Sequence, residues 1–180
     1  MTTRRTVRLL IAILLVAAGF SSQRLLDRPP AEIVPELAGT TVPDGFVLVI
    51  SVVDGDTIEI VDPATPDRTV RVRYIGVDTP ETVHPSKPVQ CFGEEASTYN
   101  HVLVDGLPVR LERDISDTDR YGRLLRYVYS EDGTFVNLEL VRQGYATVVT
   151  YPPDVAHAAE FQAAQQEARD AGRGLWTACR

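Results

Sequence analysis

The chain has 180 residues, which at about 150 residues per domain leaves room for one globular domain and a short additional segment. Hydrophobic residues make up 44% and charged residues 24%, with 12 glycines, 12 prolines and two cysteines, which excludes disordered, collagenous and disulfide-dense chains. The formal net charge of −7 argues against a polyanionic partner such as nucleic acid or an anionic membrane surface. Yet 17 of the 18 basic residues are arginine, the residue suited to bidentate contacts with phosphate or carboxylate.

Residues 1–22 are predicted to be a signal peptide or a signal anchor. Three arginines, Arg4, Arg5 and Arg8, precede an apolar run over residues 9–20, and polar residues follow it. The run is shorter than the ~20 residues that span a bilayer, which favours an export signal, and an uncleaved membrane anchor stays open. We therefore expect a secreted or extracytoplasmic protein, with a membrane tether through this segment as the alternative.

Residues 23–44 are predicted to be a linker, because they contain four prolines and no sustained hydrophobic period. The globular domain is then expected over residues 45–180. Residues 1–30 hold five arginines and one aspartate, so the rest of the chain has 13 basic and 24 acidic residues and a net charge of −11. The exported domain is therefore more acidic than the whole chain.

Both cysteines, Cys91 and Cys179, lie in this domain. We predict that they form a disulfide, because disulfides persist in the oxidising compartments to which an exported protein is sent. Two separate buried thiols remain the alternative, because the sequence does not show whether the two Cα atoms approach within bonding range.

Short β-branched runs predict most of the secondary structure. Asp54-Gly55-Asp56 separates two such runs and is typical of a hairpin turn. In the next run, alternation places Val72 and Tyr74 on one face and Arg71 and Arg73 on the other. The expected strands are residues 46–53, 57–61, 69–75, 108–113 and 124–130.

Helical periodicity appears in three segments, residues 94–104, 137–143 and 154–171. The last of these has apolar residues at helical spacing that include Phe161 and Ala168, which indicates a packing face. Five short strands with about three helices predict an α+β domain that is mainly β, built on an OB-type barrel.

Carboxylates and arginines gather near the expected strand ends. Asp-Gly-Asp-Thr at residues 54–57 and Val-Asp-Thr-Pro-Glu at residues 77–81 supply oxygen ligands of the kind that calcium and magnesium prefer. Each motif alone is more often a plain turn or a helix cap. Three nearby arginines change this interpretation, namely Arg73, Arg120 and Arg123. Carboxylates that hold a metal ion, beside converging guanidinium groups, can neutralise the charge that develops in phosphoryl transfer. The alternative is that these arginines are ordinary surface charges.

Five motifs in this order resemble the staphylococcal nuclease (thermonuclease) family, from about residue 46 to residue 176. They are VVDGDTIEI (52–60), VRVRYIGVDTPET (70–82), HPSKPVQCFGEEAS (84–97), DTDRYGRLLRYVY (117–129) and VNLELVRQGYA (136–146). The resemblance implies a calcium-dependent phosphodiesterase on an OB-fold. Such an enzyme cleaves DNA and RNA as an endonuclease or exonuclease and leaves 3′-phosphate products.

The resemblance also implies a calcium site and a general base. The carboxylates of Asp56 and Asp78 and the backbone carbonyl of Thr79 would hold Ca²⁺. Glu81, the last residue of the second motif, is then the candidate general base for a water molecule.

Phosphate and nucleotide contacts follow from the same resemblance. Arg73 and Arg123 would bind the scissile phosphate and stabilise the five-coordinate transition state. Arg120 stands where the family usually has lysine, and the segment after Gly144 is shorter than the family pattern, so the base-stacking aromatic falls on Thr150 or Tyr151. The expected substrate-binding residues are Lys87, Arg120, Tyr121 and Tyr151.

The leading hypothesis is thus an exported, monomeric nuclease that acts on DNA and RNA, single-stranded or locally open. Its acidic surface predicts weak, calcium-dependent substrate binding. One alternative is a catalytically weak OB-fold module that binds single-stranded nucleic acid or protein. The other is a structural calcium-binding domain, which accounts for the carboxylates but not for Arg73 and Arg123.

Overall fold

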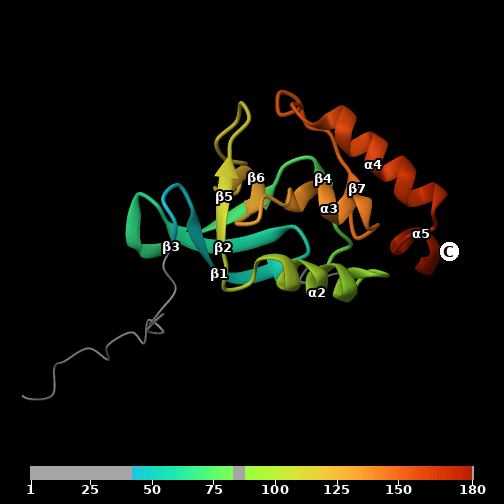
Figure 1. The fold of residues 1–180 in the computed structure, drawn as a ribbon, viewed down its shortest axis with the longest axis horizontal. Helices are drawn as coiled ribbons and strands as arrows, with labels where there is room; N and C mark the ends of the chain where they lie inside the picture. The colour runs from blue at the N-terminus through green and yellow to red at the C-terminus, as the bar shows by residue number, and fades with distance from the viewer. Residues whose placement is uncertain (1–41, 83–87, 180) are drawn as a thin grey trace, which may run out of the picture. The chain divides into compact units, whose positions relative to one another are not determined.

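Five strands form a closed barrel in the computed structural model, which describes residues 42–82 and 88–179 (Figure 1). The expectations for residues 1–22, for most of the linker and for Lys87 fall outside the described residues. The barrel order is β1-β2-β3-β6-β5, and its strands are β1 (Val47–Asp54), β2 (Thr57–Asp62), β3 (Thr65–Tyr74), β5 (Pro108–Glu112) and β6 (Leu124–Ser130). This architecture confirms the predicted mainly β barrel.

The Asp-Gly-Asp turn connects β1 and β2 as predicted, and antiparallel pairing continues from β2 to β3. The strand β3 begins at Thr65, four residues before its predicted start. Thr65 pairs with Asp62, and the register is irregular between this pair and the pair of Val61 with Thr69. The pair β3–β6 is parallel and sets Val72 beside Leu124 and Arg73 beside Leu125. This parallel pair brings the second half of the chain next to the strand that contains Arg73.

Three longer helices correspond to the three that were expected, namely α2 (Gly93–Val104), α3 (Val136–Arg142) and α4 (Ala158–Asp170). A short fourth helix, α5 (Leu175–Ala178), follows them. The predicted start of α4 at residue 154 is wrong. Asp154 instead pairs with Tyr151 in an isolated bridge, and its carboxylate accepts hydrogen bonds from the backbone N–H groups of Ile115 and Ser116.

A second, two-stranded sheet joins β4 (Val77–Asp78) to β7 (Thr147–Val148). It was not predicted, because a strand of two residues shows no alternation in the sequence. The register places Asp78 opposite Thr147, whose hydroxyl donates a hydrogen bond to the Asp78 carbonyl at 3.1 Å. This small sheet fixes the backbone immediately after the end of β3.

The hydrophobic core lies inside the barrel and under α3 and α4. Its fully buried side chains come from both halves of the chain and include Ile58, Val72, Tyr127, Leu140 and Phe161. Burying a side chain of this size contributes about 1.5–3 kcal/mol relative to leaving it exposed, so the barrel is a rigid support for the loops at its rim.

Cys91 and Cys179 form a disulfide, the pairing that we expected. The bond joins the segment before α2 to the end of α5 across 88 residues of sequence. In the part of the chain that the structure describes, no helix is long and apolar enough to cross a membrane.

Candidate active site

Asp56 lies at the tight turn between β1 and β2, and its side chain is directed into the protein. The residue is only 1% exposed. Its carboxylate accepts a hydrogen bond from the Thr79 backbone N–H at 2.8 Å and one from the Thr57 hydroxyl at 3.1 Å. A buried carboxylate needs such partners, and here they come from both carboxylate-rich motifs.

The two motifs are in close contact at Gly55. A Cβ atom added there would lie 2.6 Å from Thr79 Oγ1 and 2.8 Å from Thr79 Cβ. Such distances are well below van der Waals contact, so only glycine allows the turn to approach Thr79 this closely. The glycine therefore sets the separation between the predicted metal ligands.

Arg73 extends from β3 and bridges the two aspartates. Its guanidinium forms an ion pair with the Asp56 carboxylate, and a second one with Asp78 Oδ1 at 2.6 Å. It also donates a hydrogen bond to the Val77 carbonyl at 3.2 Å. Its side chain is 18% exposed, which leaves it able to contact a ligand from the surface side.

The donor set at this point fits a hard divalent cation. Asp56 and Asp78 face one common cationic group, the Arg73 guanidinium, and Thr79 adjoins Asp78 in the chain. Carboxylate and carbonyl oxygens are the ligands that calcium prefers. No group of three or more His, Cys, Asp and Glu side chains arranged to hold a metal occurs among the described residues. A cation here would thus rely on two carboxylates, a backbone carbonyl and water.

Asp54 and Glu81 add negative charge next to this pair. Burial raises the pKa of Asp54 above its ordinary value, Arg73 opposes the shift, and the charge of Glu81 adds to it. The charges of Glu81 and Arg73 therefore both act on Asp54. In the sequence, Asp54 belonged to the carboxylate-bearing turn but was not among the expected calcium ligands.

Glu81 is held by two reciprocal hydrogen bonds with Gln90. The Glu81 N–H donates to Gln90 Oε1 at 2.9 Å, and the Gln90 N–H donates to the Glu81 carbonyl at 2.9 Å. Gln90 directly precedes the disulfide-bonded Cys91. Nothing in the sequence indicated this contact, since it joins two ends of a segment without a recognisable period.

Arg123 is oriented by Asp119, a residue to which the sequence assigned no role. Arg123 Nε and Nη2 both lie 2.7 Å from Asp119 Oδ2. Partial burial acts to raise the pKa of Asp119, but hydrogen bonds from Arg123 and from the Tyr121 N–H outweigh it and lower the pKa. The aspartate therefore stays ionised and keeps the Arg123 guanidinium in place.

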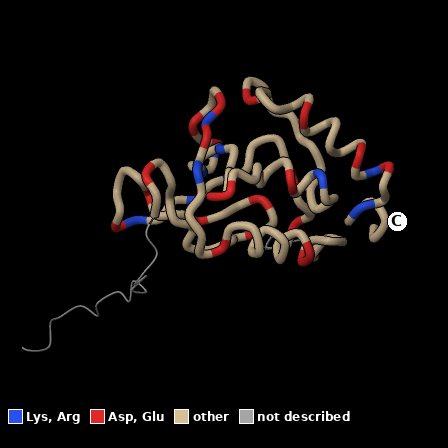
Figure 2. The backbone as a smooth tube through the Cα atoms, in the orientation of Figure 1, with Lys and Arg blue, Asp and Glu red and all other residues tan. Residues whose placement is uncertain are grey.

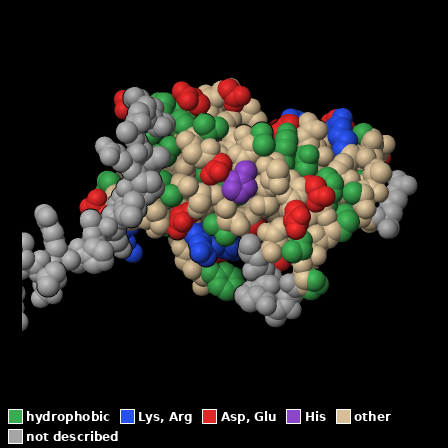
Figure 3. All heavy atoms as spheres, turned by 90° about the horizontal axis from the view of Figure 1, so that it is seen from below, with side chains coloured by type: hydrophobic (Ala, Val, Ile, Leu, Met, Phe, Trp, Pro, Cys, Tyr) green, Lys and Arg blue, Asp and Glu red, His purple; other side chains and the backbone are tan. Residues whose placement is uncertain are grey.

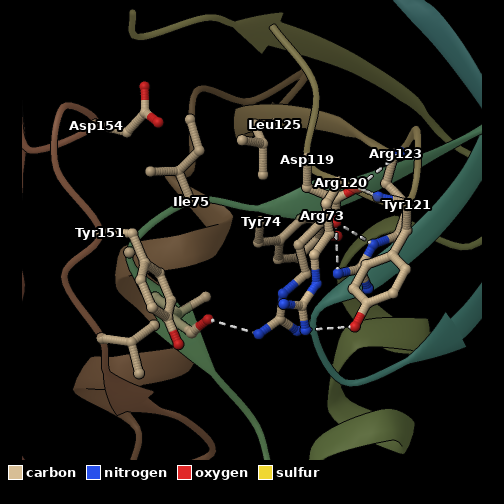
Figure 4. Close-up of a pocket in the computed structure, with 13 residues that line it drawn as sticks. Arg73, Tyr74, Ile75, Asp119, Arg120, Tyr121, Arg123, Leu125, Tyr151 and Asp154 are labelled. Atoms are coloured by element: carbon tan, nitrogen blue, oxygen red, sulfur yellow. Dashed lines mark hydrogen bonds and ion pairs between the residues drawn. The ribbon is translucent and has the colours of Figure 1, made fainter. Parts of the chain in front are cut away.

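A cavity of about 500 Å³ separates the arginines from the segment after β7 (Figure 4). Arg73 and Arg123 line one side of it, and Tyr151 lines the other. Tyr151 and Tyr121 are 73% and 69% exposed, so both rings are available to a ligand. A volume of this size accommodates a nucleotide-sized group.

Arg120 lies beside Tyr121 at the rim of the cavity (Figure 4). It donates a hydrogen bond to the Tyr121 hydroxyl at 2.6 Å, and its guanidinium lies 4.7 Å from the centre of the ring. The structure thus brings Asp56, Arg73, Asp78, Thr79 and Glu81 together. It places Arg123, Arg120, Tyr121 and Tyr151 around the adjoining cavity.

Acidic residues are spread over the whole backbone of the described domain (Figure 2). On the face drawn in Figure 3, acidic side chains are scattered and basic ones gather in a few small areas. The positive charge on this face is therefore local, and the global net charge does not describe it.

Comparisons with known proteins agree with these features. A family described as "Staphylococcal nuclease homologue" matches residues 71–178. The chain is 42% identical over 139 residues to a thermonuclease of Staphylococcus intermedius, covering 77% of this chain and 80% of that protein. It is 41% identical over 129 residues to a thermonuclease of Staphylococcus hyicus, with coverages of 72% and 74%. Endonuclease YncB of Bacillus subtilis (strain 168) is 41% identical over 127 residues, with coverages of 69% and 58%.

Proposed function

The chain belongs to the staphylococcal nuclease family and is a nuclease, and we propose that it is exported and hydrolyses DNA and RNA with calcium as its cofactor. One observation carries the proposal. Arg73 lines the nucleotide-sized cavity together with Arg123 and also contacts both predicted calcium ligands. A phosphate bound by the two arginines would therefore lie next to the cation site.

Asp56, Asp78 and the Thr79 carbonyl would hold the calcium ion. When bound, the ion supplies positive charge that neutralises a phosphate oxygen and lowers the pKa of a coordinated water. In the structure the Arg73 guanidinium bridges Asp56 and Asp78 and so balances the charge of the two carboxylates that would hold the ion.

The arginines bind the non-bridging oxygens of the scissile phosphate. A guanidinium group presents parallel N–H donors, and two of them around one phosphate stabilise the charge that develops in the transition state. Asp119 fixes the orientation of Arg123 before substrate arrives, which lowers the entropic cost of forming these contacts. Lysine, as a point charge, would not reproduce this geometry.

Glu81 takes the proton from the attacking water. The water oxygen forms a bond to phosphorus, the bond to the 5′-oxygen breaks, and the leaving oxygen acquires a proton from solvent. The products are a 3′-phosphate and a free 5′-hydroxyl. The reciprocal hydrogen bonds with Gln90 hold the backbone of Glu81 and so limit the positions of its carboxylate.

Tyr121 and Tyr151 are the aromatic contacts for the nucleotide. Their exposed rings border the same cavity and can stack on bases without regard to sequence. The substrate is then single-stranded or locally open DNA or RNA, because a paired base does not expose its ring face. The acidic surface limits further contacts, so we propose weak, calcium-dependent binding by a monomer.

The proposal of export rests on residues 1–22, with their arginines and apolar run. Secretion is proposed, with retention on the membrane by an uncleaved signal as the alternative. Fractionation of cells that express the full chain separates the two cases, because only a cleaved product would appear in the medium at reduced mass.

The test of the activity is digestion of single-stranded DNA and RNA by the purified chain, in calcium and then in EGTA. We expect cleavage that requires calcium and yields 3′-phosphate ends. Binding without cleavage would favour a nucleic-acid-binding module, and equal cleavage in both conditions would refute the metal role.

A further inference from the structure

A second hollow of about 540 Å³ lies next to the proposed site, on the outer side of β2 and β3. Tyr121 and Arg123 line both this hollow and the nucleotide-sized cavity, so the two adjoin at these side chains. Arg71, Thr69 and the carboxylate-bearing Glu59 also line it. A strand that leaves the cavity past Tyr121 would therefore enter the second hollow.

The topology of the barrel places three arginines on one face. Arg71 and Arg73 are two residues apart on β3, so their side chains emerge on the same side about 6.6 Å apart along the strand. The parallel β3–β6 register sets Val72 beside Leu124 and Arg73 beside Leu125. Arg123 thus adjoins Arg71 at the start of β6. Arg73 lines the first hollow, Arg71 lines the second, and Arg123 lines both.

Arg71 differs from its neighbours in its pairing. Arg73 and Arg123 each form an ion pair with an aspartate. The Arg71 side chain is exposed, and its guanidinium has no hydrogen bond or ion pair with any residue in the ranges 42–82 and 88–179. The carboxylate opposite it, Glu59, accepts hydrogen bonds from the Ser51 and Thr69 hydroxyls instead. An unpaired guanidinium in a hollow beside a phosphate site is suited to bind another phosphate.

We propose that Arg71 forms a second phosphate-binding subsite, which holds the phosphate next to the scissile one in a single strand. This inference rests on the proposed nuclease function, because it extends the same substrate path. Such a subsite would give a domain of net negative charge more affinity for oligonucleotides than for the minimal substrate. The subsite binds any single strand, since a phosphate contact does not distinguish bases.

The test compares the full-length chain with Arg71→Ala and Arg71→Glu on two substrates. A dinucleotide with one phosphodiester has no adjacent phosphate, whereas a single-stranded octanucleotide has several. We expect Arg71→Ala to raise KM for the octanucleotide by about threefold to fivefold, in the range of an exposed charge pair, and to leave kcat unchanged. The dinucleotide should be cleaved with unchanged kcat and KM. Arg71→Glu should raise the octanucleotide KM further.

Arg68→Ala and Arg68→Glu are the matched controls. Arg68 lies on the same strand, is exposed and lines neither hollow, so its substitution makes the same change in net charge. The salt dependence gives a second readout. Loss of one phosphate contact should reduce the slope of log affinity against log salt concentration by about 0.7 for a single strand. Equal KM values and equal salt slopes for Arg71→Glu and Arg68→Glu would overturn the subsite.

Binding separates this inference from the proposed function. If the chain cleaves nothing, the nuclease proposal fails, and the affinity for a fluorescent octanucleotide, measured by anisotropy, still tests Arg71. Weaker binding by Arg71→Glu than by Arg68→Glu would then support the subsite in a binding protein. Equal affinities would refute it. If the wild-type chain cleaves both substrates and Arg71→Glu matches its control, only the subsite is wrong.

Discussion

The Arg73 guanidinium lies 2.6 Å from Asp78 Oδ1, so a predicted phosphate ligand and a predicted metal ligand are paired in the structure. The same guanidinium contacts Asp56. The proposed phosphate and metal sites therefore share one side chain, and a change at either site is expected to affect the other.

Replacement of Arg73 or Arg123 by lysine should abolish most of the turnover and leave the fold intact. Lysine keeps the charge but loses the bidentate contact, and removal of one such transition-state contact costs about 10²- to 10³-fold in kcat. Steady-state kinetics on single-stranded DNA measure the loss, and circular dichroism checks the fold. Arg110→Lys is the control, because Arg110 is exposed on β5 and pairs with Glu112 away from the cavity. Unchanged kcat in both site variants would remove the two arginines from the mechanism.

Calcium should raise the melting temperature of the chain. A ligand that binds only the folded state at 100 times its Kd stabilises it by about 2.7 kcal/mol. Asp78→Asn removes one of the two carboxylates and should eliminate most of this shift. Differential scanning calorimetry with calcium and with EGTA provides the measurement, which does not depend on activity. An equal shift in the wild-type chain and the variant would place the ion elsewhere.

Gly55→Ala should reduce activity by displacing the loop that contains Asp78. The new methyl group would overlap the Thr79 side chain, whose nearest atom would be 2.6 Å away. Overpacking of this kind costs about 1–3 kcal/mol of stability, measurable by chemical denaturation. The double variant Gly55→Ala/Thr79→Gly removes the clashing side chain but keeps the backbone carbonyl of residue 79, so it should regain part of the activity. Full activity in Gly55→Ala alone would contradict the role of this close approach.

Removal of the disulfide should destabilise the domain strongly. The bond closes a loop of 88 residues, for which the chain-entropy account gives about 4–5 kcal/mol. The double variant Cys91→Ser/Cys179→Ser should therefore unfold at a lower urea concentration than the oxidised wild-type chain. Dithiothreitol should lower the midpoint of the wild-type chain alone, since the variant has no disulfide to reduce. A dithiothreitol effect of equal size on both proteins would assign it to another cause.

Local sequence patterns were sufficient to predict the barrel and most of its helices. Val72 and Tyr74 are buried, whereas Arg71 is exposed and Arg73 partly so, as the alternation indicated. The short sheet β4–β7 could not be found in this way, because it depends on tertiary contacts between segments about 70 residues apart. The predicted start of the last long helix at residue 154 was wrong for the same reason. The Asp154 carboxylate accepts hydrogen bonds from the backbone of a loop that is distant in sequence.

The candidate site shows the same difference between what local sequence patterns predict and what depends on tertiary contacts. Motif order selected the candidate residues, and the structure places Arg73 in contact with Asp56 and Asp78, with Glu81 following in the same motif as Asp78. The residues that orient them were missed. Asp119 and Gln90 act through contacts with Arg123 and Glu81, and their side chains have no distinguishing pattern in the sequence. Orientation of a side chain depends on three-dimensional contacts, which a linear motif does not encode.

Tyr74 should make the stability of the domain depend on pH in the alkaline range. Its side chain is fully buried, and the hydroxyl donates a hydrogen bond to Asn100 Oδ1 at 2.9 Å. Burial raises the pKa of Tyr74 well above its ordinary value of 10.0. The folded state therefore keeps this proton when the unfolded chain has lost it. The resulting contribution to stability is full below pH 10 and is lost as the pH rises from there towards the folded-state pKa.

Tyr74→Phe tests this contribution. At neutral pH the variant should lose about 1 kcal/mol, because the Asn100 carbonyl group loses its donor. Asn100 also donates to the Asp54 carbonyl at 3.0 Å, so the loss extends to the turn that contains Asp56. Urea unfolding at pH 8 and at pH 11 should show a smaller decrease in stability for the variant than for the wild-type chain. Equal decreases in the two proteins would assign the alkaline transition to other groups. Tyr127, which is also buried and whose pKa burial also raises, is the first to examine.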